Sequence, residues 1–121
     1  MTVDSTRLIR PEHLNHHGDL FGGRLLEWAD EHAYVAARRE FPGRRFVTVA
    51  MDQVSFQSPV HNGDLLRLSA ERSRLGTSSV RFRVRGHASG RDGVEREVFV
   101  TEVTLVSIGD DGKARAITPM P

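Results

Sequence analysis

The sequence predicts an α+β fold in which one long helix packs against an antiparallel sheet. Residues 24–39 have the apolar spacing of a helix, four later segments have the composition of strands, and short glycine-containing turns separate most of these strands. Short turns favour antiparallel pairing, and a helix that is separated in sequence from the run of strands favours the α+β class.

The N-terminal part is expected to hold a short strand and a loop before the helix. We place the first strand at residues 6–10. Residues 11–23 are expected to form a loop, because they contain a proline, three histidines and three glycines with little periodicity. The helix should stop before Pro42 and Gly43. Its apolar face is expected to consist of Leu25, Leu26, Ala29, Ala33, Ala36 and Ala37.

The rest of the chain is expected to form four strands. Residues 46–56 are rich in β-branched and aromatic side chains, and residues 65–74 alternate apolar and polar. Residues 80–85 alternate three apolar side chains with three arginines, which should lie on a solvated face or an interface. Residues 94–108 are apolar on both faces in the middle, as in a central strand. A sheet that curls around one apolar helix leaves apolar surface and sheet edges exposed, so we expect a dimer.

Composition narrows the possible functions. The 121 residues correspond to one domain, residues 1–121. No segment has the length and hydropathy of a membrane helix or an export signal, so we expect a cytoplasmic protein without membrane insertion. The absence of cysteine excludes disulfides, thiolate metal sites and a cysteine nucleophile. A net charge of +1 argues against nucleic acid as a partner, although the many arginines are compatible with one phosphorylated ligand.

Two features around the helix start can carry chemistry. Gly22 and Gly23 either let a ligand approach the free N–H groups of the helix or simply permit a tight bend. Asp30, at the border of the polar stripe, is either a solvated carboxylate or a general base. Gly23 and Asp30 are separated by about 10 Å along one helix. If both act on one small carbonyl, they should come from two helices that meet across a dimer.

Other residues and motifs give less support for a metal site, a ligand site or a catalytic site. His16 and His17 are adjacent in the loop, but no third ligand has a metal-site spacing, so we expect no metal. Ser78 and Ser79 either bind a ligand or cap a hairpin. The chain has no G-x-S-x-G elbow, P-loop or G-x-G-x-x-G motif, so a serine hydrolase, a nucleotide hydrolase and a dinucleotide-binding protein lack support.

The stretch N-H-H-G-D-L-F-G-G-R-L-L-E-W-A-D, residues 15–30, resembles the signature of acyl-CoA thioesterases with the hotdog fold. Supporting stretches are residues 47–50, Phe56 with residues 59–60, residues 63–64 and residues 76–80. The resemblance covers residues 7–117. It implies one long helix wrapped by a curved antiparallel sheet, used as a dimer and often as a trimer of dimers. It also implies an acyl-CoA substrate and no cofactor other than the coenzyme A of the substrate or product.

The resemblance assigns roles to individual residues. It implies that Asp30 is the catalytic carboxylate, that Asn15 positions the thioester or the water, and that Thr48 lies near the reacting centre. The Gly22–Gly23 helix start resembles the oxyanion site of the family. The residues expected to contact the substrate or the CoA nucleotide are Phe21, Gly76, Thr77, Ser78, Ser79 and Arg115, with Lys113 beside them.

The sequence leaves alternatives for the mechanism and the function. Asp30 either activates a water molecule or attacks directly to form a mixed anhydride. The protein is either a hydrolase, a non-hydrolytic acyl-CoA or acyl-carrier binding protein, or a dehydratase-like relative that uses His16 or His17. An arginine-rich module for nucleic acid is disfavoured by the near-zero net charge.

Overall fold

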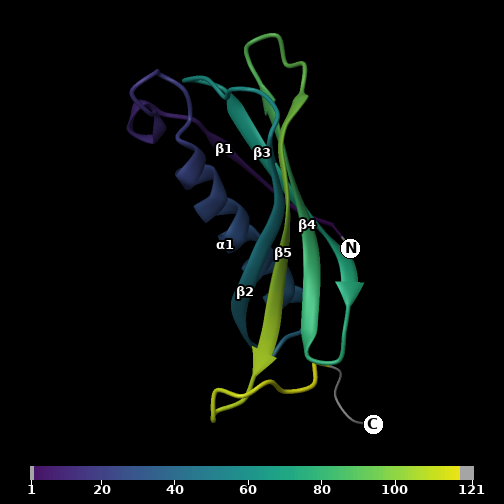
Figure 1. The fold of residues 1–121 in the computed structure, drawn as a ribbon. Coiled ribbons are helices and arrows are strands. Elements are labelled where there is room, and N and C mark those ends of the chain that lie inside the picture. Colours follow the sequence, from purple (N-terminus) through teal and green to yellow (C-terminus); the bar gives the residue numbers. More distant parts are fainter. Residues whose placement is uncertain (1, 118–121) are drawn as a thin grey trace.

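The structure is a computed structural model that describes residues 2–117, and it confirms the predicted α+β class. One long helix packs against a five-stranded antiparallel sheet (Figure 1). In chain order the elements are β1 (Thr2–Leu8), η1 (a 3-10 helix, Pro11–His13), α1 (Gly22–Glu40), β2 (Arg45–Phe56), β3 (Leu65–Leu75), β4 (Ser79–Ser89) and β5 (Arg96–Ile108).

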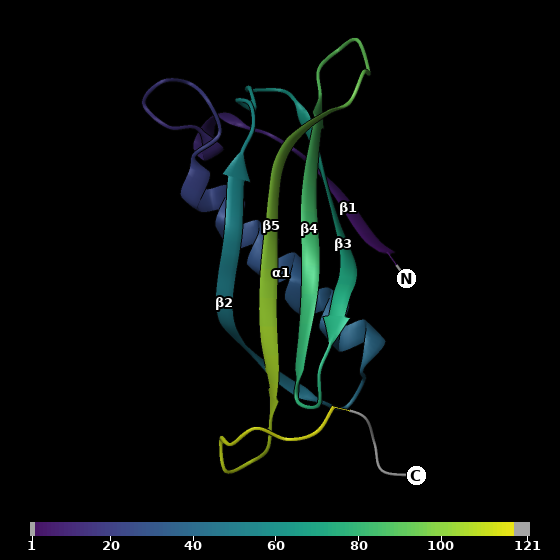
Figure 2. The same cartoon turned by 45° about the vertical axis from the view of Figure 1, so that its right-hand side comes forward.

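The strands lie in the order β1-β3-β4-β5-β2, and each neighbouring pair is antiparallel. β2, the first strand after the helix, therefore lies at one edge of the sheet, and β1 lies at the other. The sheet curves around α1, which crosses its concave face (Figures 1 and 2). This order decides which side chains can reach the helix and which strand edge stays open.

Alanine spacing on α1 allows the helix to approach the sheet closely. Ala29, Ala33 and Ala37 are fully buried, and their small side chains leave room for large sheet residues such as Phe82 and Phe99. Fully burying a side chain as large as phenylalanine stabilises the fold by about 1.5–3 kcal/mol. The helix is thus fixed along its length, and the side chains that flank the buried stripe have defined positions.

Several predicted boundaries differ from the structure. β4 extends to Ser89, beyond the predicted residue 85. β1 begins at Thr2 and ends at Leu8, because this edge strand is exposed except at Val3 and so carries no apolar alternation. α1 begins at Gly22, two residues before the predicted start, so both glycines belong to its first turn. β5 begins at Arg96, after the turn that holds Gly93 and Val94.

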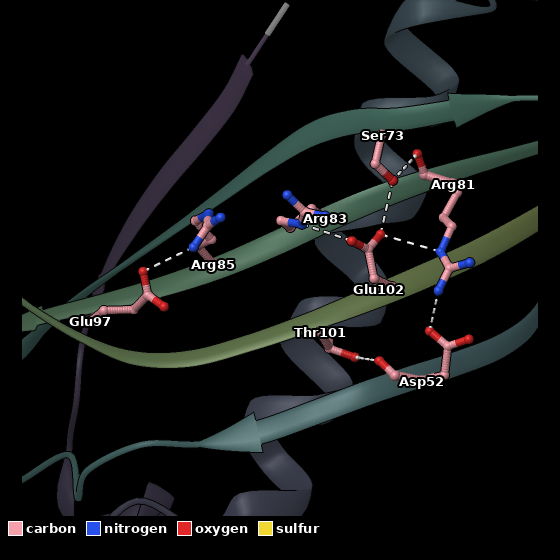
Figure 3. A network of polar contacts seen from close by, with 8 residues as sticks. All are labelled: Asp52, Ser73, Arg81, Arg83, Arg85, Glu97, Thr101 and Glu102. Carbon is pink, nitrogen blue, oxygen red and sulfur yellow. Dashed lines mark hydrogen bonds and ion pairs between the residues drawn. The ribbon is translucent and has the colours of Figure 1, made fainter.

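The row of arginines in β4 lies on the face of the sheet away from α1, and its members are paired (Figure 3). Arg83 Nε lies 2.7 Å from Oε1 of Glu102, and Arg81 Nε lies 3.3 Å from Oε2 of the same carboxylate. Arg85 pairs with Glu97 at 3.1 Å. Because Glu102 is only 4% exposed, these pairs hold the central strands together.

Candidate active site

The first turn of α1 presents uncovered backbone donors. Phe21 is the N-cap residue and provides no side-chain cap. The N–H groups of Arg24 and Leu25 donate to the carbonyl of Phe21, at 3.0 and 3.3 Å. Those of Gly22 and Gly23 have no acceptor within residues 2–117. Such groups at the positive end of a helix can bind an anion or a developing oxyanion.

The two glycines are needed because aromatic rings approach the backbone closely there, and not because the chain bends. Both lie in regular helix, and neither has a positive φ. A Cβ atom on Gly23 would lie 2.8 Å from the ring of Phe21, and one on Gly22 would lie 3.4 Å from the ring of Phe56. The rings of Phe21 and Phe56 are themselves about half exposed. The helix start is therefore a bare patch of backbone between two aromatic rings.

Asn15 lies in a cavity of about 400 Å³ beside this helix start, together with Gly22 and Phe56. Its side-chain Oδ1 accepts hydrogen bonds from the backbone N–H groups of His17, at 2.9 Å, and Asp19, at 3.2 Å. Two donors use both lone pairs of that oxygen, so the side chain can offer a ligand only its Nδ2 donors. The Nδ2 donors can bind a carbonyl oxygen of a ligand.

Asp30 and Thr48 lie together farther along the helix. Thr48, on β2, donates its Oγ1–H to Oδ1 of Asp30 at 2.6 Å. Asp30 is half-buried, and Thr48 is exposed at the open edge of the sheet. The bond fixes the orientation of the carboxylate and leaves Oδ2 for another partner, which is the arrangement that a general base or a nucleophile needs.

The predicted nucleotide contacts form a third group at the opposite end of the molecule from the helix start (Figures 1 and 2). Residues 76–79 close the β3–β4 hairpin with a 2.8 Å bond from Gly76 N–H to the carbonyl of Ser79. Ile117 donates its N–H to the carbonyl of Thr77 at 2.9 Å, which ties the segment that carries Arg115 to this turn. Residues 76–79 and the segment that carries Arg115 therefore lie in one region of the structure, and one chain keeps them away from Gly23.

The open edge of β2 adjoins both the Asp30–Thr48 pair and the helix start. Two register shifts interrupt the pairing of β2 with β5, and Gln53 has a positive φ of 51° at the second shift. The large apolar side chains exposed along this strand are Val47, Val49, Val54 and Phe56. An apolar, unpaired strand edge is the kind of surface that another chain covers.

Sequence reasoning missed two members of this region. Phe56 was noted as part of the family resemblance and was not assigned to the site, yet its ring flanks Gly22. Ser58 lines the same cavity, and its buried hydroxyl has no hydrogen-bond partner among the described residues. Phe56 ends β2 and Ser58 follows it by two residues. The sequence alone gives no indication that the chain returns to the helix start at this point.

The adjacent histidines of the loop before the helix, His16 and His17, contact each other. The rings of His16 and His17 lie 3.9 Å apart. Within residues 2–117, no three histidine, aspartate or glutamate side chains are grouped as metal ligands. In the same part of the chain, no helix is long and apolar enough to span a membrane.

The chain is similar to known proteins over most of its length. A family model described as the thioesterase superfamily matches residues 17–95. An uncharacterised acyl-CoA thioester hydrolase of Zymomonas mobilis is 33% identical over 111 residues, which are 91% of this chain and 74% of that protein. The mouse acetyl-coenzyme A thioesterase is 36% identical over 87 residues, and the match covers 72% of this chain but only 16% of the mouse protein.

Solved structures of acyl-CoA hydrolases and thioesterases are also similar to this chain. The acyl-CoA hydrolase of Staphylococcus aureus in complex with butyryl coenzyme A and coenzyme A is 30% identical with a TM-score of 0.88, over 96% of this chain and 71% of that one. Variants of that hydrolase with an aspartate, an asparagine or a threonine replaced by alanine also match. A hexameric thioesterase of Yersinia pestis is 28% identical with a TM-score of 0.86, over 95% and 93% of the two chains. The family model and these similarities confirm the predicted hotdog fold, and the chain belongs to the thioesterase superfamily, among the hotdog-fold acyl-CoA thioester hydrolases.

Proposed function

We propose that this protein hydrolyses acyl-CoA to a free carboxylic acid and coenzyme A, without a further cofactor. The observation that carries the proposal is the Asp30–Thr48 hydrogen bond on the same helix whose first N–H groups are uncovered. The Staphylococcus aureus relative supports the substrate class, because its structure holds butyryl coenzyme A. The three residue types replaced in its variants are those of Asp30, Asn15 and Thr48.

In the proposed mechanism, the thioester carbonyl oxygen accepts hydrogen bonds from the N–H of Gly23 and from Nδ2 of Asn15, and Gly22 N–H adds to this site. Asp30 removes a proton from a water molecule, whose oxygen attacks the carbonyl carbon. The carbonyl electrons move onto the oxygen, where the helix start stabilises the charge. Collapse of this intermediate breaks the C–S bond, and the CoA sulfur leaves and takes up the proton. In the alternative mechanism, the Asp30 carboxylate attacks the carbonyl carbon directly, a mixed anhydride forms as CoA leaves, and water then hydrolyses the anhydride.

The proposed active site is shared by two copies. Gly23 and Asp30 are both on α1, about 10 Å apart along its axis, which is too far for one small carbonyl. A twofold dimer through the apolar edge of β2 would run the two helices in opposite directions and bring Gly23 of one copy towards the Asp30 carboxylate of the other. We propose this dimer as the active unit and a trimer of dimers as the full assembly, which the hexameric Yersinia pestis relative supports.

The same dimer accounts for the remaining predicted residues. The β3–β4 turn, residues 76–79, and Arg115 lie at the end of the molecule opposite the helix start, so an antiparallel partner carries them towards that start. We propose that they contact the CoA nucleotide and that the exposed ring of Phe21 contacts the pantetheine arm. We propose a cytoplasmic location, because acyl-CoA is available there.

Replacing Asp30 tests the proposal. Asp30→Ala should lower kcat for thiol release by at least about a hundredfold, because proton transfer by a positioned base contributes on that scale. Coenzyme A should still bind, which calorimetry measures. The matched control is Glu31→Ala, an exposed carboxylate one position along α1, which should keep the wild-type rate.

A panel of acyl-CoA thioesters from short to long chains completes this test. Hydrolysis by Asp30→Ala at the wild-type rate would show that Asp30 is not the catalytic group. A wild-type protein that coenzyme A stabilises against heat, but that releases thiol from no member of the panel, would contradict hydrolysis and favour a binding protein.

A further inference from the structure

Three arginines from three different elements meet around η1, outside the site described above. Arg7 comes from β1, Arg10 precedes η1, and Arg24 lies in the first turn of α1. A surface hollow of about 270 Å³ is lined by Arg7, Arg10, Leu8 and His13. It shares no lining residue with the cavity beside Gly22.

Each of the three guanidinium groups contacts a neighbouring residue. The guanidinium carbon of Arg7 lies 4.0 Å above the ring of Trp28. Arg24 Nη2 donates to the backbone carbonyl of Glu12 at 3.4 Å, and Arg10 Nη2 lies 3.0 Å from Oε2 of the same residue. Among residues 2–117, Glu12 is the one carboxylate within 4.0 Å of any of these three arginines. The cluster therefore carries three positive charges and one negative charge.

His13 is buried next to this charge and responds to it. The backbone N–H of Arg10 donates to its Nδ1 at 3.0 Å, so the ring is neutral with its proton on Nε2. Burial lowers the pKa of His13. The positive charges of Arg24, Arg10 and Arg7 lower it further, and the negative charge of Glu12 opposes these effects. The carbonyl of His13 accepts the N–H of Phe21 at 3.0 Å, which joins the cluster to the helix start.

We propose that Arg7, Arg10 and Arg24 bind the phosphate monoester of the substrate, the 3′-phosphate of CoA. The inference rests on the proposed function. A phosphate monoester carries close to two negative charges near neutral pH, which matches the two uncompensated positive charges of the cluster. Arginine binds phosphate through paired N–H donors in a fixed geometry.

The position of the cluster fits this assignment. In acyl-CoA the pantetheine arm and the diphosphate separate the thioester from the 3′-phosphate, so the two ends need different sites. The hollow is lined by His13, whose carbonyl accepts the N–H of Phe21, and the cavity is lined by Gly22, the next residue, so both lie beside one helix start. The β3–β4 turn would then contact the rest of the nucleotide.

Two substrates that differ only in this phosphate test the assignment. The variant is Arg10→Gln combined with Arg24→Gln, and the matched control is Arg91→Gln, an exposed arginine in the β4–β5 turn. With butyryl-CoA, the double variant should raise KM about tenfold or more at unchanged kcat, since a charge-assisted hydrogen bond has about that effect. With butyryl-3′-dephospho-CoA, the double variant and the wild type should have the same KM. Arg91→Gln should match the wild type with both substrates.

An equal rise of KM for both thioesters would overturn the assignment to the 3′-phosphate, and an unchanged KM for butyryl-CoA would overturn the site. A second measurement does not depend on hydrolysis. Adenosine 3′,5′-bisphosphate bound at the cluster should raise the pKa of His13, followed by NMR of its ring protons, and an unchanged titration would contradict the site. A protein that hydrolyses no thioester but shows this shift would lose the proposed function and keep the phosphate site.

Discussion

His13 is a buried histidine whose proton affinity links local structure to stability. Burial and three nearby arginines lower its pKa below the ordinary value of 6.5, against the opposing effect of Glu12. The unfolded chain therefore binds more protons than the folded protein as the pH falls below 6.5. The stability that neutral His13 contributes is complete above that pH and is lost as the pH falls through the folded pKa.

We therefore predict that the urea midpoint of unfolding falls between neutral pH and about pH 5, and that His13→Asn removes part of this fall. Asparagine keeps an acceptor near the position of Nδ1 and cannot take up a proton. The control is His17→Asn, at an exposed position, which should keep the wild-type dependence. Equal pH dependence in wild type and His13→Asn would show that His13 does not contribute.

The pairing of Thr48 with Asp30 shows what a residue pattern leaves open. Thr48 was predicted from the family resemblance alone, and Asp30 from its position on the helix as well. Helical spacing placed Asp30 correctly at the border of the apolar face, but nothing in the spacing linked it to Thr48, eighteen residues later. Their contact depends on where β2 lies relative to α1, and that follows from the strand order. The arginine cluster was missed for the same reason, since its members come from β1, the segment before η1, and α1.

At the scale of the elements, strands with one buried face were predictable and edge strands were less so. β3 and β4 alternate because one face packs on α1, whereas the central strand β5 is buried on both faces in its middle. The predicted positions of all three agree with the structure within a few residues. The position of β1 depends on its pairing with β3 alone, and the predicted bounds, residues 6–10, therefore differ from the observed strand Thr2–Leu8. The start of α1 was placed too late because glycine is a poor helix former. The first turn forms nevertheless, between the rings of Phe21 and Phe56.

That first turn leads to a prediction about Gly23. In Gly23→Ala, the higher helix propensity of alanine, about 0.8–1 kcal/mol, is opposed by displacement of the exposed Phe21 ring, so the free energy of unfolding should change by less than about 1 kcal/mol. kcat should fall about a hundredfold, because the methyl group and the displaced ring obstruct the backbone donor. Steady-state thiol release and urea unfolding measure the two effects.

The control for this prediction is Gly90→Ala. The added Cβ there would lie 3.7 Å from Oδ1 of Asp64, an ordinary contact, so the variant should keep the wild-type kcat. A Gly23→Ala protein with wild-type kcat would show that the helix start does not bind the oxyanion. A Gly23→Ala protein that is strongly destabilised would show that the glycine is needed for the fold.

At the scale of the whole molecule, the strand order explains why one chain is incomplete. β2 follows the helix in sequence but lies at the edge of the sheet, where Val47, Val49, Val54 and Phe56 are exposed and, within residues 2–117, one row of its backbone groups has no strand beside it. The Asp30–Thr48 pair and the helix start both adjoin this edge. A second copy that covers the edge would therefore complete the hydrophobic surface and the active site at the same time.

Mixed dimers test the shared site directly. Asp30→Ala and Gly23→Ala should each be nearly inactive alone. When the two variants are co-expressed with different tags in equal amounts, about half of the dimers are mixed, and each mixed dimer has one site with both groups intact. The mixture should therefore recover about a quarter of the wild-type rate. A mixture as inactive as its components would place Gly23 and Asp30 of one site on the same chain. Asp30→Ala mixed with Thr48→Val is the control, because Thr48 bonds Asp30 within one chain and neither site of a mixed dimer would be intact.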